Sequence, residues 1–455
     1  MKPLLAGAAL ALFAGAVAAD KLVIQAGKIL TLAGEEIENG VILIENGRIA
    51  AIGAANSIET PWDATVIGGP EHVAMPGFVE AHSNSGMDRT NENIDVAPFL
   101  DIRDSVDPVA YYFEDCLRWG ITTVNLQQGW NCVVGGQGMI VRPHGMTVEA
   151  MMMRPTYGLK LSARPKSGKS RATQAQALRT AFGDLRRYLE DLVQSEKDER
   201  GFAKREALFQ GRDLEGEKSE GKAMTGKAWT VAGLELIPRG AIDEKQAPLL
   251  DVVEGNQTIY FECDRAMDVD TALSIARDNG FLEKTVLVVD ADCWEAFDAI
   301  AAAGVPVVLD GELVHMHRDP LSGEETEKFA AGILAEKGIP FALTSRNSST
   351  QSLWFQAAKA VGFGLDREDA LAAVTSSPAA ILGVDVGTLE TGKLGNIVLM
   401  TGDPLKVTSL VDHVVIEGAH VYDRSKDVRN KQLLDGTQPS GTQAEPTPTV
   451  AKDEE

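Results

Sequence analysis

The sequence predicts a mixed α/β protein built as a (β/α)8 barrel, of the TIM-like type, with additional β structure at both ends of the chain. Between residues 75 and 384, short apolar runs alternate with segments of helical spacing, a pattern that indicates parallel strands joined by helices. Residues 21–67 hold β-rich runs that are separated by glycines. This segment is too small to enclose a large core alone. The run Phe78–His82 follows a Pro-Gly turn signal and is predicted to be a buried strand. In such a barrel the chemistry takes place at the carboxyl ends of the strands.

The predicted strands of the α/β region follow one another at regular intervals. They are residues 78–82, 121–126, 157–161, 258–262, 285–290, 305–309 and 340–344. Residues 196–227 are rich in charge and glycine and are interpreted as a surface insertion. Residues 425–455 lose apolar periodicity and are predicted to form a disordered acidic tail.

Composition excludes some classes of partner. The chain has 455 residues and a net charge of −23. A surface this acidic repels phosphate backbones, so a nucleic-acid partner is not expected. The four cysteines are sparse for a chain of this length and form no CxxC motif, which favours buried free thiols over a thiolate metal site.

The first residues have the pattern of an export signal. Lys2 precedes an apolar run from Leu4 to Val17, and the small residues Ala18 and Ala19 come before Asp20. We therefore expect residues 1–19 to be a signal peptide and the mature protein to be periplasmic or secreted. The apolar run is shorter than the about 20 residues that a membrane span needs, and no later run is longer, so no membrane span is expected.

Several segments together resemble the amidohydrolase superfamily, and in particular its exported imidazolonepropionase-like members. The segment Met75–Gly86 is similar to the "PGxIDxHxH" run of the first barrel strand in that family. Similar likenesses are found for residues 119–124 ("GVTTV"), 131–138 ("NxxGGxG"), 264–268 ("HADRAxD") and 373–383 ("AVTxNPAxxLG"). The resemblance implies a barrel over residues 75–384, beside a split β-sandwich that is assembled from residues 20–74 and 385–424.

The same resemblance implies a site with one or two divalent metals, which lower the pKa of a bound water while an Asp takes its proton. His82 matches the first ligand, but Asn84 replaces the second histidine. Ala163 stands where a bridging Glu is expected, and Glu262 occupies the position of a histidine ligand. The candidate metal ligands are therefore His82, Asn84 and Glu262, a set that is poor in nitrogen donors for zinc.

The catalytic candidates are Arg346, Glu262 and Asp290. The next histidine ligand of the family falls at Val289 or Asp290, and Arg346 stands where the general base is expected. We hypothesise that the Arg346 cation pairs with Glu262 or Asp290 and replaces the charge once carried by the metal. Lys160 is interpreted as a surface cation, with carbamylation as the alternative.

The loop that resembles "NxxGGxG" assigns substrate binding to Asn131, Gly136 and Gln137. His315 and His317 form an HxH pair that is interpreted as a surface feature. The remaining histidines are isolated along the sequence and are interpreted as structural or surface residues rather than ligands: His72, His144, His413 and His420.

Three functions remain open at this point. The favoured hypothesis is a pseudoenzyme without a cofactor, in which the family chemistry, hydrolysis of a non-peptide C–N bond in a cyclic amide or a blocked dipeptide, is impaired. An alternative is an active hydrolase that binds Zn or Mn through oxygen ligands, namely Glu262, Asp290 and Asp292 with His82. A further alternative is a structural or scaffold protein. The expected partner is a small-molecule substrate or ligand, with homo-oligomers or pairing with an active relative as further possibilities.

Overall fold

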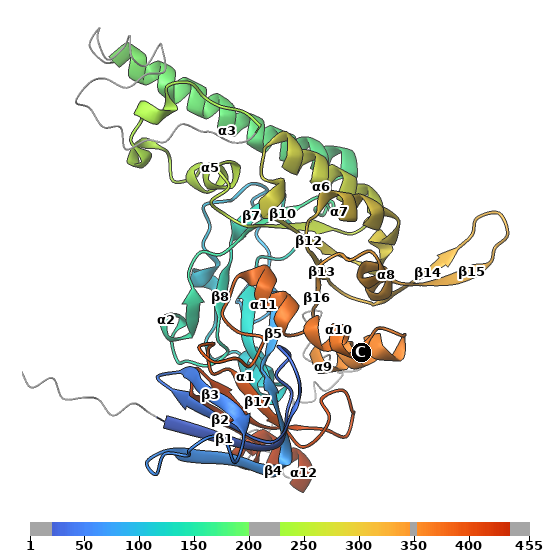
Figure 1. The fold of residues 1–455 in the computed structure, drawn as a ribbon. Helices are drawn as coiled ribbons and strands as arrows, with labels where there is room; N and C mark the ends of the chain where they lie inside the picture. Colours follow the sequence, from blue (N-terminus) through green and yellow to red (C-terminus); the bar gives the residue numbers. More distant parts are fainter. Residues whose placement is uncertain (1–20, 200–227, 346–352, 437–455) are drawn as a thin grey trace, which may run out of the picture.

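The computed structural model describes residues 21–199, 228–345 and 353–436 (Figure 1). The predicted signal peptide and most of the predicted surface insertion lie outside these ranges, as does Arg346. In the described part of the chain, no helix is long and apolar enough to cross a membrane. Cys116, Cys132, Cys263 and Cys293 are all buried and unpaired with one another, as predicted.

The two ends of the chain form one seven-stranded sheet, which we call the terminal sheet. Its order is β19-β18-β17-β4-β1-β2-β3. The bounds are β1 (Lys21–Ile29), β2 (Ile37–Glu45), β3 (Arg48–Ala54), β4 (Thr65–Pro76), β17 (Ile397–Met400), β18 (Val411–Ile416) and β19 (Ala419–Asp423). Strand β17 pairs antiparallel with β4, from Ile397 opposite Pro76 to Met400 opposite Val73. The predicted pairing of the two chain ends is confirmed, whereas a two-sheet sandwich is not, because all seven strands belong to one sheet.

Both faces of the terminal sheet are buried, and alternate residues of β17 show this. Ile397 and Leu399 pack with residues of β1 and β2 in a small core of the terminal sheet itself. Val398 and Met400 pack into the main core beneath the α/β part. The sheet curls, since Gly47 accepts a hydrogen bond of 2.8 Å from the amide of Gly395 and Lys393 accepts one of 2.9 Å from Ile49. Curling closes the small core on its open side.

The α/β part contains two sheets. A six-stranded sheet has the order β16-β13-β12-β11-β10-β7 and a four-stranded sheet the order β5-β6-β8-β9. The bounds are β5 (Phe78–Ser83), β6 (Ile121–Leu126), β7 (Val134–Gln137), β8 (Met139–Val141), β9 (Met152–Arg154), β10 (Leu159–Ser162), β11 (Ile259–Cys263), β12 (Thr285–Val289), β13 (Val307–Leu309) and β16 (Phe341–Leu343).

Parallel pairing, the main prediction for this region, is confirmed for β5 with β6 and along β10, β11, β12, β13 and β16. The closed barrel is not formed by the described strands. After β6 the chain runs back as β8, which pairs antiparallel with β6, while β7 pairs antiparallel with β10. These two short strands stand where a further parallel strand would have to bridge β6 and β10. The architecture is therefore a mixed α/β fold with two open sheets.

Helices lie around the sheets of the α/β part and connect several of their strands (Figure 1). They are α1 (Tyr111–Arg118), α2 (Val148–Met151), α3 (Arg171–Glu199), α5 (Ala247–Val253), α6 (Ala266–Asp278), α7 (Phe297–Ala303), α8 (Ala330–Glu336), α9 (Leu353–Gly362), α10 (Arg367–Ala372) and α11 (Ser376–Leu382). A hairpin of β14 (Val314–Arg318) and β15 (Glu325–Phe329) projects from the α/β part. His315 and His317 lie on β14 of this hairpin.

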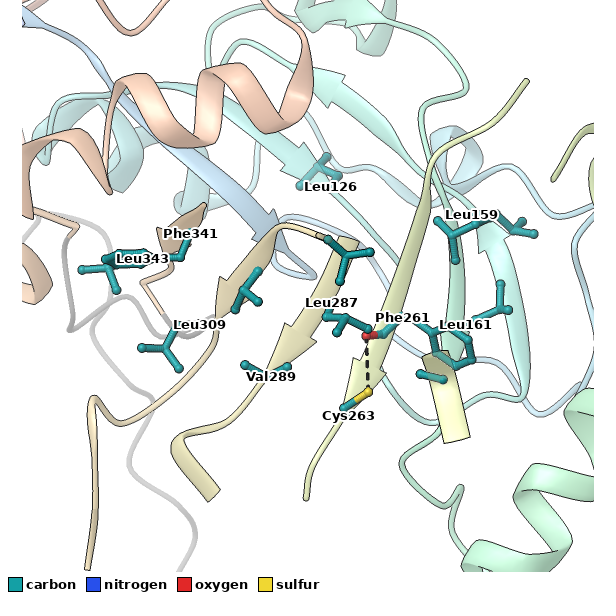
Figure 2. Close-up of a cluster of buried hydrophobic side chains, with 14 of the residues drawn as sticks. Leu126, Leu159, Leu161, Phe261, Cys263, Leu287, Val289, Leu309, Phe341 and Leu343 are labelled. Carbon is teal, nitrogen blue, oxygen red and sulfur yellow. Dashed lines mark hydrogen bonds between the residues drawn. The ribbon is translucent and has the colours of Figure 1, made fainter. Parts of the chain in front are cut away.

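Side chains alternate between the two faces of the parallel strands, as extended backbone requires. Figure 2 shows one face, where Leu159 and Leu161 of β10 lie beside Phe261 of β11 and Leu287 of β12. All of these belong to the main core under the helices. The intervening residues, among them Lys160 and Glu262, must therefore point to the opposite face. This alternation places charged side chains inside the curve of the sheets.

The prediction of a disordered tail from residue 425 onward includes residues that form helices in the structure. Residues 425–436 contain the end of a short 3-10 helix, Arg424–Lys426, and the helix α12 (Val428–Asp435). Asp427 caps α12 by accepting bonds from the amides of Arg429 and Asn430, and it also accepts a bond of 2.8 Å from Arg118 Nε in α1. The prediction of disorder is wrong here because a buried carboxylate ties the segment to α1. Residues 437–455 lie outside the described ranges.

Replacing Asp427 should show how firmly α12 is attached. Asp427→Ala removes one of the three carboxylates that pair with Arg118 and also the cap of α12, and we expect it to lower the free energy of unfolding by about 1–3 kcal/mol in urea denaturation. Asp435→Ala, at the exposed end of the same helix, serves as the control and should change stability by less than about 0.5 kcal/mol. Equal effects of the two substitutions would contradict the role assigned to Asp427.

Candidate functional site

The candidate site is built around Lys160, whose side chain is completely buried. Its Nζ atom lies 2.6 Å from Oε2 of Glu262 and 2.8 Å from Nε2 of His82. The parallel register of β10 and β11 sets Ser162 opposite Glu262, so that Lys160 reaches the carboxylate from one strand away. The interpretation of Lys160 as a surface cation is wrong. The signal in the sequence was its place between two leucines in an apolar strand.

His82 is held as a neutral imidazole. Burial lowers the pKa of His82 well below its usual value, and the positive charge of Lys160 lowers it further. A neutral ring accepts at one nitrogen and carries its proton on the other, so Nε2 accepts from Lys160 and the proton lies on Nδ1. Within the described residues, Nδ1 is buried and has no hydrogen-bond partner. An orphaned donor at this place is available to a bound ligand or water.

Lys160 stabilises the charged form of Glu262, which burial and the nearby charge of Asp310 disfavour. Burial raises the pKa of Glu262, the ammonium of Lys160 opposes that rise, and the charge of Asp310 adds to it. An isolated buried carboxylate is costly, and a buried ammonium equally so. Each ion therefore depends on the other to stay charged in this interior.

Glu80 adds a second buried carboxyl group, two residues before His82 on β5. Its Oε2 accepts bonds from the amide and the hydroxyl of Ser345, at 3.0 and 2.5 Å. Burial raises the pKa of Glu80 to about 8, although the two bonds from Ser345 oppose the rise and Asp310 adds to it. At neutral pH this side chain is therefore mostly a neutral acid. Sequence reasoning missed Glu80, although an acid two residues from a candidate ligand on a strand was a usable signal.

Asp310 is a further acid that the sequence reasoning missed. It follows β13 directly, is half-buried, and its Oδ1 accepts a bond of 2.7 Å from the hydroxyl of Thr344. Its charge raises the pKa values of both Glu80 and Glu262, so it lies close to both carboxyl groups. An acid immediately after an apolar run was the available signal.

Other predicted residues have less defined roles. Asn84 follows β5 and is half-buried, and half-buried Asp290 precedes a short 3-10 helix, Ala291–Ala296. Arg346 lies outside the described residues, so its pairing with Glu262 or Asp290 stays a prediction. The cation that does contact Glu262 in the described part is Lys160.

The three residues predicted to bind substrate make structural contacts. The Asn131 side chain accepts a bond of 2.8 Å from the amide of Ser167, and the amide of Gly136 donates to Gln128 Oε1 at 2.6 Å. Gln137 pairs with Leu159 in the sheet. These contacts hold the loop against β10, beside the site, and substrate binding by the three residues stays a prediction.

The donor set does not fit the metal that the family resemblance implies. Zinc is held by three or four nitrogen, sulfur or carboxylate ligands. Of the predicted metal ligands, the two described side chains with such donor atoms, His82 and Glu262, both contact the Lys160 ammonium, and Asn84 and Ala163 stand at two other ligand positions. A cation already lies where a metal would have to bind. Of the described residues, three metal-binding groups come within 4.8 Å of one another only at His72, Asp412 and His413, on the terminal sheet.

The chain thus has a largely parallel α/β fold, with titratable side chains gathered inside the curve of its sheets. Comparison with known proteins gives the family. Residues 252–426 match the profile described as the Amidohydrolase family.

Two curated relatives match a short part of the chain. One is the 5-methylthioadenosine/S-adenosylhomocysteine deaminase of Nitratidesulfovibrio vulgaris, 39% identical over 82 residues, which is 17% of this chain and 19% of that protein. The other is the protein of the same name from Desulforamulus reducens, 36% identical over 84 residues, 18% of this chain and 19% of that protein. The match thus spans about a fifth of the length of either relative.

A solved structure supports the fold over most of the chain. An amidohydrolase from Thermotoga maritima has a TM-score of 0.69 and 24% sequence identity, and the match covers 89% of this chain and all of that one. At this identity the likeness concerns the fold. The predicted resemblance to the amidohydrolase superfamily is confirmed by the family match over residues 252–426 and by this likeness of fold.

The raised pKa of Glu80 predicts a dependence of stability on pH. Because the folded protein keeps a proton that the unfolded chain releases above its ordinary pKa of 4.5, stability should fall as pH rises from there to about 8. This one group contributes a slope of at most about 1.4 kcal/mol per pH unit. Glu80→Gln imitates the neutral acid and keeps an acceptor for Ser345, so its stability should fall less steeply.

Urea denaturation of both proteins between pH 5 and 8 measures this difference. The free energy of unfolding of Glu80→Gln, relative to that of the wild type, should increase as pH rises. A stability difference that stays constant over the whole range would show that Glu80 is ionised in the folded protein.

The ion pair of Lys160 and Glu262 can be tested by a double-mutant cycle. Lys160→Met leaves the Glu262 carboxylate buried and unpaired, and we expect a loss of about 3–5 kcal/mol in the free energy of unfolding. The double variant Lys160→Met with Glu262→Met replaces both ions by apolar groups and should recover most of that loss. A single variant as stable as the wild type would contradict the buried pair.

Proposed function

We propose that this protein is an exported amidohydrolase-family protein that binds a small polar molecule inside the curve of its parallel strands, without metal-dependent hydrolysis. The observation that carries the proposal is the position of Lys160 Nζ, within hydrogen-bond distance of both His82 and Glu262. These are the side chains that match ligand positions of the family. An ammonium group there repels a divalent cation and uses the electron pairs that would bind it.

The residues present support ligand binding better than water activation. A metal lowers the pKa of its bound water and acts as a Lewis acid, whereas an ammonium group only donates hydrogen bonds. His82 has a buried Nδ1 without a partner in the described part of the chain, and Glu80 is mostly neutral at pH 7. Together with the ion pair, these groups suit a polar molecule that offers hydrogen-bond acceptors.

The second candidate is an active hydrolase or deaminase of C–N bonds. The family domain and the names of the curated relatives favour it. The oxygen-rich version of this site, with Asp292 as a ligand, is not favoured, because Asp292 Oδ1 lies 2.6 Å from Nδ1 of His315 on the projecting hairpin. Export to the periplasm or medium rests on residues 1–19 alone and stays part of the proposal.

An ammonia-release assay separates the two candidates. The purified mature chain is incubated with 5-methylthioadenosine or S-adenosylhomocysteine, each with and without added zinc or manganese. We expect no ammonia above the protein-free background, because the metal cannot bind at His82 and Glu262. The deaminase of Nitratidesulfovibrio vulgaris is the positive control. Ammonia release that rises with added metal and is lost in His82→Gln would overturn the proposal.

Retained binding needs its own readout. A thermal-shift screen of small amides, blocked dipeptides and nucleosides should find compounds that raise the melting temperature of the wild type. The Lys160→Met/Glu262→Met variant keeps the fold but lacks the charges, so it should lose the shift. Compounds that shift both proteins equally bind elsewhere and would count against the proposed site.

A further inference from the structure

Three of the seven histidines in the chain meet on the terminal sheet, away from the strands that carry Lys160. His72 lies on β4, His413 on β18 and His420 on β19. These histidines are isolated along the sequence, and the pairing of the two chain ends brings them together. The His413 ring centroid is 5.6 Å from that of His72 and 5.1 Å from that of His420. None of these residues takes part in the site around Lys160.

The geometry of the cluster is that of a metal site. One ligand atom each of His72, Asp412 and His413 lies within 4.8 Å of the other two. Asp412 Oδ2 is 2.9 Å from His72 Nε2 and 3.9 Å from His413 Nε2. Ligands at about 2.0–2.1 Å from a tetrahedral zinc ion are separated by about 3.3 Å. The two observed separations bracket this value, so small side-chain movements would admit an ion.

A bulge in β18 produces this arrangement. Leu399 of β17 pairs with His413, but Met400 pairs with Val411, so Asp412 is an extra residue in the strand. Bulges re-aim side chains and are frequent beside functional sites. Here the bulge lets Asp412 and His413, which are consecutive residues, both approach His72.

The outer nitrogens of both rings have polar neighbours. His413 Nδ1 lies 3.2 Å from Nε2 of His420, and His72 Nδ1 lies 3.4 Å from the carboxylate of Glu71. Metal-binding histidines are commonly oriented by such a group at the second ring nitrogen. The other oxygen of Asp412 lies 4.0 Å from Arg424 Nη1, which leaves Oδ2 directed at the histidines.

One side of the cluster is buried and the other side is open to solvent. The side chain of His72 is only 6% exposed, whereas those of His413 and Asp412 are 19% and 28% exposed. The buried histidine fixes one ligand firmly, and the exposed side gives an ion access from solvent. A water molecule can supply the fourth ligand there.

We propose that His72, Asp412 and His413 bind a divalent transition-metal ion, zinc in the first place, on the terminal sheet. Two imidazoles and one carboxylate suit zinc and its neighbours in the first transition series better than calcium or magnesium. His72 comes from the N-terminal segment and the other two ligands from the C-terminal segment. The ion would therefore join the two ends of the chain and stabilise the sheet on which the α/β part rests.

Titration calorimetry with zinc chloride tests the site in the full mature chain after treatment with a chelator. We expect one equivalent of zinc to bind to the wild type and the affinity to fall by at least about 100-fold in His413→Gln and in Asp412→Asn. Zinc should also raise the melting temperature of the wild type but not of these variants. His317→Gln, a histidine on the projecting hairpin, is the matched control and should bind zinc as the wild type does.

Two results would overturn the inference. One is the absence of zinc binding at the cluster, seen either as no binding by the wild type or as unchanged affinity in both His413→Gln and Asp412→Asn. The other is loss of zinc binding in His82→Gln while His413→Gln keeps it, which would place the ion beside Glu262. The second result would also contradict the proposed function, whereas the first would leave it untouched. Circular dichroism of each variant shows that the terminal sheet is still folded.

Discussion

Burial of the Lys160 ammonium is the constraint on which the candidate site depends. A charge with no exposed surface must be matched by a carboxylate and by further acceptors. Glu262 and His82 meet that need from the strands β11 and β5, so the hydrogen bond between Lys160 and His82 also links the two sheets of the α/β part. The same contacts use the two side chains that a family metal would require. Structural stability and metal binding are therefore exclusive alternatives at this place.

The neighbouring groups follow from the same need to limit charge. Burial keeps His82 neutral and holds a proton on Glu80 at neutral pH. Asp310, nearer to solvent, favours that proton through its own charge. The interior thus holds one ammonium with one carboxylate, and its other groups are largely neutral. Such a set can orient a polar ligand through hydrogen bonds.

Much of the fold could be predicted from the sequence because it depends on local patterns. The apolar runs 121–126 and 285–290 predicted strands whose ends agree with those of β6 and β12 to within one residue. The resemblance of both chain ends to parts of one family domain predicted that they pair in the terminal sheet. The antiparallel strands β7 and β8 could not be foreseen, since they are short and their direction depends on contacts distant in sequence. The same reason explains α12, whose anchor is a bond between Asp427 and Arg118.

The candidate site could be predicted only in part. His82 and Glu262 were found because they match positions of a known pattern. Lys160 was misjudged because its residue type is usually exposed, and only the alternation of side chains along β10 shows that it points inward. The cluster of His72, Asp412 and His413 was invisible because His72 lies 340 residues before Asp412 and meets it only through strand pairing and a bulge.

The most direct test of this account is a crystal of the mature protein soaked in zinc and measured at the zinc absorption edge. The account predicts ordered density for the Lys160 side chain between His82 and Glu262, with no anomalous peak at that place. An anomalous peak within bonding distance of His82 and Glu262, with Lys160 turned away, would contradict it.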